Sequence, residues 1–136
     1  MKIAVSHERA LAASPDQVAS LLSDFDRIWP THLAPAPRRL GPGCYDTGLM
    51  LWQEVDRPGA ARAFQVVRPT GLQGEHWFEL TSRDGATVLR HTVSAVATGR
   101  FAVLWRARIA RLHDQILEAL LDNVQRALAA EHPASR

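Results

Sequence analysis

Residues 73–98, QGEHWFELTSRDGATVLRHTVSAVAT, decide the fold of this chain. The dipeptide Asp84-Gly85 is typical of a two-residue turn, and apolar residues alternate with polar ones on both sides of it. The pattern predicts an antiparallel hairpin in which Arg83 lies opposite Ala86, and Phe78 therefore lies opposite His91. One face of the hairpin then carries His76, Phe78, Leu80, Leu89, His91 and Val93. The other face carries Trp77, Glu79, Arg90, Thr92 and Ser94, which suit contact with water apart from Trp77.

Alternating runs before the hairpin predict further strands. Residues 45–55 and 62–68 form two of them, separated by the turn residues Asp56-Arg57-Pro58-Gly59. Residues 30–43 are rich in proline and predict a loop at the rim of the fold, with a short strand at residues 38–40. Residues 2–13 predict the first strand of the chain, and one of its faces carries Ile3, Val5, His7, Arg9 and Leu11.

A short helical segment follows the first strand. Ser14-Pro15-Asp16-Gln17 is a strong helix start, because Ser14 can cap the helix, proline suits its first position, and Gln17 completes a capping box. The segment is expected to break near Asp24–Asp26 and to end at Pro30. Its apolar residues recur at helical spacing and are Val18, Leu21, Leu22 and Phe25.

Residues 101–130 predict one long helix, because apolar residues recur there at every third or fourth position. This stripe consists of Trp105, Ile109, Leu112, Ile116, Leu120, Val124 and Leu128. A long helix with one apolar stripe needs a broad apolar surface to pack on, and the antiparallel sheet provides it. We therefore expect an α+β fold with helices on one face of the sheet and water on the other.

Composition narrows the class of protein. The 136 residues suit a single domain, residues 1–136, with 46% hydrophobic and 22% charged residues. A net charge of +2 without a basic block gives no reason to expect a nucleic-acid partner. The single cysteine, Cys44, excludes an internal disulfide and a multi-cysteine metal site. Charges at His7-Glu8-Arg9 interrupt any signal peptide, and no apolar run is long enough to span a membrane, so we expect a cytoplasmic protein.

Together these elements resemble the START-like superfamily, also called SRPBCC or helix-grip, and in particular its polyketide cyclase/dehydrase and lipid-transport group. The matching stretches are ALAASPDQVASLLSDFDRIWP (residues 10–30), PRRLGPGCYDTG (37–48) and the helix after ATVLRHTVSAVATGRF (86–101). The resemblance implies a curved antiparallel sheet of six or seven strands around the long C-terminal helix, with two short helices after strand one. It also implies a hollow between sheet and helix that holds lipids, quinones, polyketides or other apolar molecules, and no cofactor.

Histidines on the inner face of the sheet are the candidate functional residues. His76 and His91 share that face, and the resemblance implies that the first strand pairs with the last, which brings His7 beside His91. His113, next to the stripe of the long helix, could point toward them. Histidine can serve as a general acid or base, or as a hydrogen-bonding anchor for a ligand. A buried polar atom without a partner costs about 1–3 kcal/mol, so these rings are either satisfied by the protein or face ligand or water.

The expected ligand-binding residues are collected from the inner face of the sheet, the rim and the helix stripe. They are His7, Trp29, Phe64, Val66, His76, Phe78, Leu80, Leu89, His91, Val93, Trp105, Ile109, Leu112 and Ile116.

Three functions remain open on this basis. Binding of a small hydrophobic or aromatic ligand is favoured, because no nucleophile motif, phosphate-binding loop or dinucleotide fingerprint occurs. The alternative is an enzyme of the cyclase or aromatase kind with His76 or His91 as acid or base. The third is a macromolecule-binding module. In each case we expect a monomer or a weak dimer. No metal is expected, because no HxH or HExxH spacing occurs. The macromolecule-binding function would use Trp77 or the arginines near the start of the long helix, which are Arg100, Arg106, Arg108 and Arg111.

Overall fold

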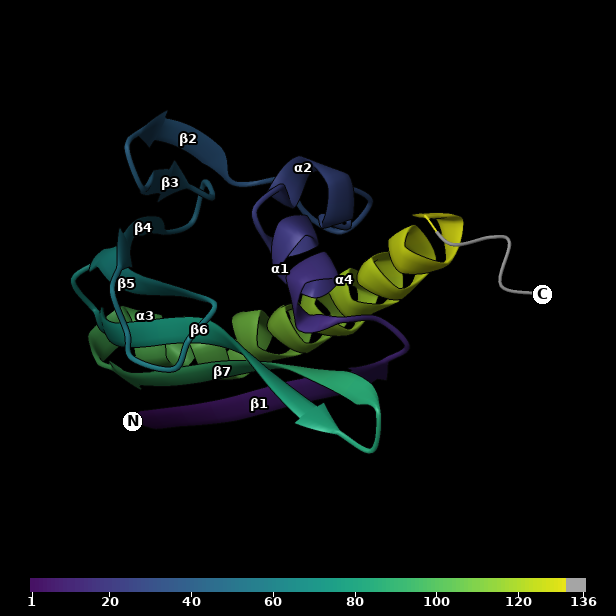
Figure 1. Ribbon diagram of the computed structural model, residues 1–136. Coiled ribbons are helices and arrows are strands. Elements are labelled where there is room, and N and C mark those ends of the chain that lie inside the picture. The colour runs from purple at the N-terminus through teal and green to yellow at the C-terminus, as the bar shows by residue number, and fades with distance from the viewer. Residues whose placement is uncertain (132–136) are drawn as a thin grey trace.

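The computed structural model describes residues 1–131 and shows a curved antiparallel sheet wrapped around a long helix (Figure 1). Seven strands follow one another across the sheet in the order β1-β7-β6-β5-β4-β3-β2. This arrangement confirms the predicted α+β helix-grip fold, while the predicted domain end at residues 132–136 lies outside the described residues. The strands are β1 Lys2–Leu11, β2 Arg38–Gly41, β3 Cys44–Asp46, β4 Leu51–Val55, β5 Arg62–Arg68, β6 Leu72–Arg83 and β7 Ala86–Ala97. The helices are α1 Pro15–Leu22, α2 Phe25–Ile28, α3 Gly99–Leu104 and α4 Ala110–Glu131, with η1 Trp105–Ile109 between the last two.

The β6–β7 hairpin has the register that its turn predicts. Asp84 and Gly85 both have positive φ, 53° and 79°, as a two-residue turn of the type that matches strand twist requires. Phe78 pairs with His91 as predicted. On the other side of β7, strand β1 pairs so that His7 lies directly opposite His91. The register of β1, β7 and β6 is therefore fixed.

The prediction of one strand over residues 45–55 is wrong. The chain turns between β3 and β4, which pair with each other as an antiparallel hairpin. Side-chain bonds close this turn: the Thr47 hydroxyl accepts from the backbone N–H of Met50 at 2.9 Å, and the Asp46 carboxylate accepts from Gly48 N–H at 2.8 Å. Such local side-chain bonds compete with the sheet ladder, and Gly48 supplies the positive φ of 87° that the turn needs.

The short helices begin and break where expected. Ser14 caps α1, its side chain accepting from Gln17 N–H at 3.2 Å, while the Gln17 side chain accepts from Ser14 N–H at 2.8 Å. The chain then breaks at Asp24 before the single-turn helix α2. In Figure 1 these two helices lie beside the C-terminal half of α4.

The long C-terminal helix starts at Gly99, two residues before the prediction, and continues to Glu131. It contains one widened turn, η1, in which the backbone N–H of Ala110 donates to the carbonyl of Trp105 five residues earlier. Such π-type turns are rare and are commonly found at functional sites. Trp105 and Ile109, at either end of this turn, both remain buried against the sheet.

The core is divided into two groups along the concave face. One lies where α1, α2 and the end of α4 meet the sheet, and includes Phe25, Phe64, Leu89, Leu121 and Val124. The other lies at the start of the helix and consists of Ile3, Leu72, Val93, Ala95, Ala97, Phe101, Trp105 and Ile109.

The convex face is polar, as the alternation of the strands predicts. Trp77 lies on it but is only 9% exposed, because the guanidinium of Arg57 lies over its ring, 3.6 Å from the ring centroid. Arg57 also pairs with Glu75 at 3.3 Å. None of the helices within residues 1–131 combines the length and apolar character that crossing a membrane would require.

Candidate functional site

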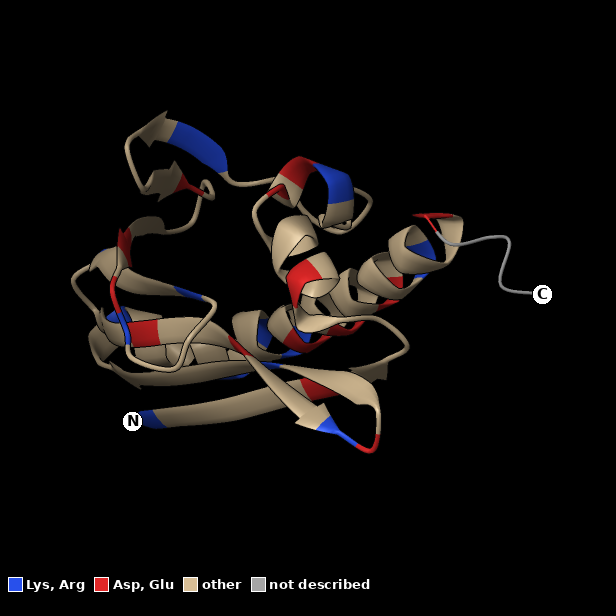
Figure 2. Cartoon of the chain, in the orientation of Figure 1, with Lys and Arg blue, Asp and Glu red and all other residues tan. Residues whose placement is uncertain are grey.

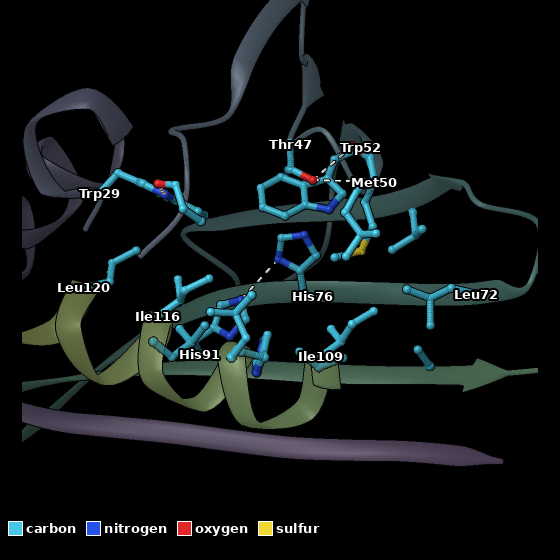
Figure 3. Close-up of a pocket in the computed structure, with 18 of the residues that line it drawn as sticks. Trp29, Thr47, Met50, Trp52, Leu72, His76, His91, Ile109, Ile116 and Leu120 are labelled. Atoms are coloured by element: carbon cyan, nitrogen blue, oxygen red, sulfur yellow. Dashed lines mark hydrogen bonds between the residues drawn. The ribbon is translucent and has the colours of Figure 1, made fainter. Parts of the chain in front are cut away.

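A cavity of about 150 Å³ lies between the sheet, the long helix and the rim loops. Its walls are almost entirely apolar. They contain residues of both core groups, so the cavity lies between the two groups. Leu49 and Leu112 line its outer edge and are 45% and 36% exposed. Figure 3 shows the helix residues Ile109, Ile116 and Leu120 on one side and Trp52, Met50 and His76 on the other.

Two histidines form the polar part of the cavity wall. His76 on β6 and His91 on β7 are diagonal neighbours on the concave face, and His76 Nδ1 lies 3.1 Å from His91 Nε2 (Figure 3). Both side chains are buried, with 8% and 3% exposure. The hydrogen bond fixes their tautomers relative to each other, because one ring must donate and the other accept.

The far nitrogens of this pair have no protein partner. Within residues 1–131, the buried side-chain nitrogens without a hydrogen bond are Trp52 Nε1, His76 Nε2, His91 Nδ1 and His113 Nδ1. The Trp52 and His76 rings meet edge to face with centroids 4.2 Å apart, and both line the cavity. A buried orphan polar atom is costly, so each is a position where a ligand atom or water gains a hydrogen bond.

Burial keeps these imidazoles neutral. Desolvation lowers the pKa of His76 from 6.5 to about 3, with a smaller contribution from His113. The pKa of His91 is lowered in the same direction, first by burial and then by the neighbouring His76. Burial, followed by proximity to His7, lowers the pKa of His113 to about 4. The imidazoles of the cavity wall are therefore uncharged, and the carboxylate of Glu75, which also lines the cavity, is paired with Arg57 at 3.3 Å.

Most of the residues expected to bind a ligand line this cavity. The structure places Trp29, Val66, His76, Phe78, His91, Val93, Trp105, Ile109, Leu112 and Ile116 in its wall.

The other expected residues lie elsewhere on the concave face. Phe64 is fully buried and stacks on His76 with centroids 5.1 Å apart, so it supports the wall from behind. Leu89 is fully buried in the first core group, and Leu80 packs against that group. His7 faces α4 and contacts Asp114 and Glu118 instead of the cavity. These four residues lie outside the cavity wall, and their contact with a ligand stays a prediction.

The cavity wall also contains residues outside the expected set, which are Phe25, Ala34, Pro35, Thr47, Leu49, Met50, Trp52, Leu72, Glu75, Ala95, Leu117 and Leu120. Trp52 could have been predicted as a lining residue, because it pairs with Val66, one of the expected ligand-binding residues, and lies on the same face of the sheet. His113, whose direction was open, lines the cavity on its helix side.

The arginines have structural or surface positions. Arg100, Arg106, Arg108 and Arg111 are all exposed and lie outside the cavity wall. Arg62 points inward, donating to both Glu54 carboxylate oxygens, to the Tyr45 hydroxyl and to the carbonyl of Leu22. Its guanidinium lies over the Phe25 and Phe64 rings, so it joins α1 to the sheet.

A polar seam joins β1 to α4 on the other side of His113. Its members are His7, Arg9, Asp114, Glu118 and Asp122. Arg9 donates to Asp122 at 2.8 Å, and His7 lies between two carboxylates, 2.8 Å from Glu118 and 3.0 Å from Asp114. Figure 2 shows acidic and basic residues interspersed along α4.

Known structures share the fold of this chain. A START superfamily protein from Mycobacterium smegmatis matches 90% of this chain over 94% of its own length, with a TM-score of 0.59 and 15% identity. The chain has the START-like, helix-grip fold. An aromatase/cyclase from Streptomyces matches 97% of the chain over 99% of its own length, with a TM-score of 0.58 and 17% identity. A conserved protein from Geobacillus kaustophilus matches 96% over 97%, with a TM-score of 0.66 and 17% identity.

At these identities the likeness shows the START-like fold alone. No family model matches the sequence, and no curated protein matches it.

Proposed function

We propose that this chain binds a small, largely apolar molecule that carries one carbonyl or hydroxyl group, in the cavity between its sheet and long helix. The observation that carries the proposal is an apolar cavity whose wall contains the unpaired nitrogens of Trp52 and His76. Trp52 Nε1 can only donate, whereas His76 Nε2 donates or accepts according to the tautomer of the histidine pair. A ligand oxygen beside them removes the cost of leaving these atoms unpaired.

The size of the cavity limits the ligand. An apolar cavity of about 150 Å³ in another protein accommodates benzene, so one aromatic ring suits the space of the same volume here. A longer molecule would extend past Leu49 and Leu112 at the outer edge. Neutral imidazoles favour an uncharged ligand, because a carboxylate buried here would have no cation to offset its desolvation.

The proposal can be tested with matched pairs of single-ring compounds, such as acetophenone and ethylbenzene. Each is added at millimolar concentration in a thermal-shift assay, and the Kd of each is measured by calorimetry. A ligand at 100 times its Kd stabilises a protein by about 2.7 kcal/mol. We expect both compounds to raise the Tm, and the ketone to bind at least five-fold more tightly.

A variant separates the polar contact from the apolar one. His76→Phe keeps a ring of similar size but removes Nε2, so the preference for the ketone should shrink, with Trp52 Nε1 as the remaining donor, while ethylbenzene still binds. Val103→Ala, at a position 69% exposed outside the cavity wall, serves as the control and should keep the preference. Failure of the whole compound set to stabilise the protein, with nothing bound to the purified chain in native mass spectrometry, would remove the proposal.

A cyclase or aromatase-type activity is the second candidate, since a hydrogen-bonded histidine pair beside a cavity can transfer protons. The pKa of about 3 at His76 weighs against it, because a general base works best with a pKa near the operating pH. Turnover of a polyketide-type chain that is abolished by both His76→Gln and His91→Gln, in variants that remain folded, would favour this candidate over simple binding.

A further inference from the structure

The polar seam brings together side chains that are far apart in the sequence. His7 comes from the first strand, while His113 and Asp114 come from the last helix. One potential ligand atom from each of these three lies within 4.8 Å of the other two. The HxH and HExxH spacings that usually reveal such a group cannot occur here, because its members come from opposite ends of the chain.

The two contacts of His7 leave a position for a cation. Its Nδ1 lies 2.8 Å from Glu118 Oε2, and its Nε2 lies 3.0 Å from Asp114 Oδ1. A neutral imidazole carries one N–H, so donation to Glu118 turns the lone pair of Nε2 toward the lone pairs of Asp114. Only a proton or a metal ion between these two atoms makes that contact favourable.

His113 supplies the third donor. Its Nδ1 is buried without a hydrogen bond among residues 1–131, and it lies 4.0 Å from Asp114 Oδ1. Its ring centroid is 6.0 Å from that of His7. A buried neutral imidazole with a free lone pair is the form in which histidine binds a metal.

We propose that His7 Nε2, His113 Nδ1 and the Asp114 carboxylate bind a divalent transition-metal ion of the Zn²⁺ class. Donors at about 2.0–2.1 Å in tetrahedral geometry lie about 3.3 Å apart, so His7 and Asp114 are already spaced for it and His113 must approach by about an ångström. Two imidazoles and one carboxylate favour Zn²⁺, Co²⁺ or Ni²⁺ over Ca²⁺ and Mg²⁺. Solvent fills the fourth position, because Asp114 is half exposed.

Glu118 completes the arrangement as a positioning residue. Metal-binding histidines usually donate their other N–H to a carboxylate, which fixes the ring and makes it a stronger ligand. The contact of Glu118 with His7 Nδ1 has this geometry. Since His113 also lines the ligand cavity, the ion would lie beside the cavity wall, but the proposal does not depend on ligand binding there.

The experiment uses the full chain after treatment with EDTA and removal of the chelator. Co²⁺ alone is titrated while the visible absorption that marks tetrahedral coordination is recorded, and Zn²⁺ alone is titrated by calorimetry. We expect one equivalent of each to bind, with Zn²⁺ displacing Co²⁺. His113→Gln and Asp114→Asn should weaken Zn²⁺ binding at least 100-fold, and Glu118→Gln by about 10–100-fold.

Asp122→Asn is the matched control, because Asp122 belongs to the same polar seam but contacts Arg9 instead of His7. It should change the Zn²⁺ affinity less than three-fold, and circular dichroism confirms that each variant is folded. Absence of stoichiometric Co²⁺ and Zn²⁺ binding up to 1 mM would overturn the proposal. Binding that is unchanged in both His113→Gln and Asp114→Asn would overturn it as well.

Discussion

The two flanks of α4 meet the sheet in different ways. Along the flank facing β1, the seam residues Asp114, Glu118 and Asp122 are held by His7 and Arg9. Along the other flank, Leu112 and Ile116 face the cavity. His7 and His91 are direct neighbours on the concave face. His7 lies between two carboxylates, whereas His91 is buried in the apolar wall of the cavity. The position of the helix over the sheet, more than the type of residue, therefore decides what each histidine can do.

The largest contrast is expected between a packed and an unpacked part of α4. Leu121 is fully buried in the first core group, so Leu121→Ala should lower the free energy of unfolding by about 2–5 kcal/mol. Leu112→Ala, at a position that lies beside the cavity and is 36% exposed, should lower the free energy of unfolding by less than about 1 kcal/mol. Urea unfolding of both variants measures the difference. Equal losses would mean that the cavity flank is packed as tightly as the core.

Acidic pH should strongly lower the stability of the folded chain, because the histidines of the cavity wall are buried in their neutral form. Because the pKa of His76 is about 3 in the folded chain and 6.5 when unfolded, the unfolded state binds the extra proton. Stability is therefore complete above pH 6.5 and is lost as the pH falls toward 3. At pH 5 the loss from His76 alone is about 2 kcal/mol relative to pH 8.

Unfolding by urea at several pH values, with EDTA present, measures this dependence. His76→Phe should make the profile flatter by that amount, whatever its effect on stability at pH 8. His32→Asn, at an exposed position on the rim, should leave the profile unchanged. A profile that is the same in His76→Phe and in the unaltered chain would contradict a neutral, buried His76.

The smallest effect is expected in the polar seam. Arg9 donates to Asp122, Glu118 and Gln125, but the two carboxylates are half exposed. Arg9→Met keeps the apolar stem and should cost about 0.5–1 kcal/mol in low salt. The difference should shrink in 1 M NaCl, because salt screens exposed charges. A loss above 2 kcal/mol that is insensitive to salt would show that the seam holds α4 more firmly than its exposure suggests.

Local patterns in the sequence predict the fold well. Asp84-Gly85 fixes the hairpin register, and through it the neighbourhood of His76 and His91, because a two-residue turn allows one pairing of its flanks. The strand prediction over residues 45–55 fails, because Thr47 and Asp46 bond to nearby backbone and turn the chain in the middle of an alternating run. Alternation alone does not reveal such competition.

The candidate site is harder to predict from the sequence than the fold. Alternation assigns Leu80 and Leu89 to the correct face, but it does not show where along that face the helix stays in contact. That position depends on α1 and α2 packing over the hairpin end, which is a tertiary property. His7 and His113 likewise meet only because β1 pairs with β7 and α4 crosses over that edge.

The widened turn at Trp105–Ile109 has a consequence for the evolution and engineering of this chain. It contains one residue more than a regular α-helix needs to complete the same turn. Each residue of a regular α-helix advances by about 100°, so a one-residue deletion elsewhere in the helix would rotate everything after it by that angle. The same deletion in this turn would remove the extra residue and leave the later residues on their present faces. The widened turn is thus a position at which the helix can lose one residue without changing which side chains α4 presents to the sheet.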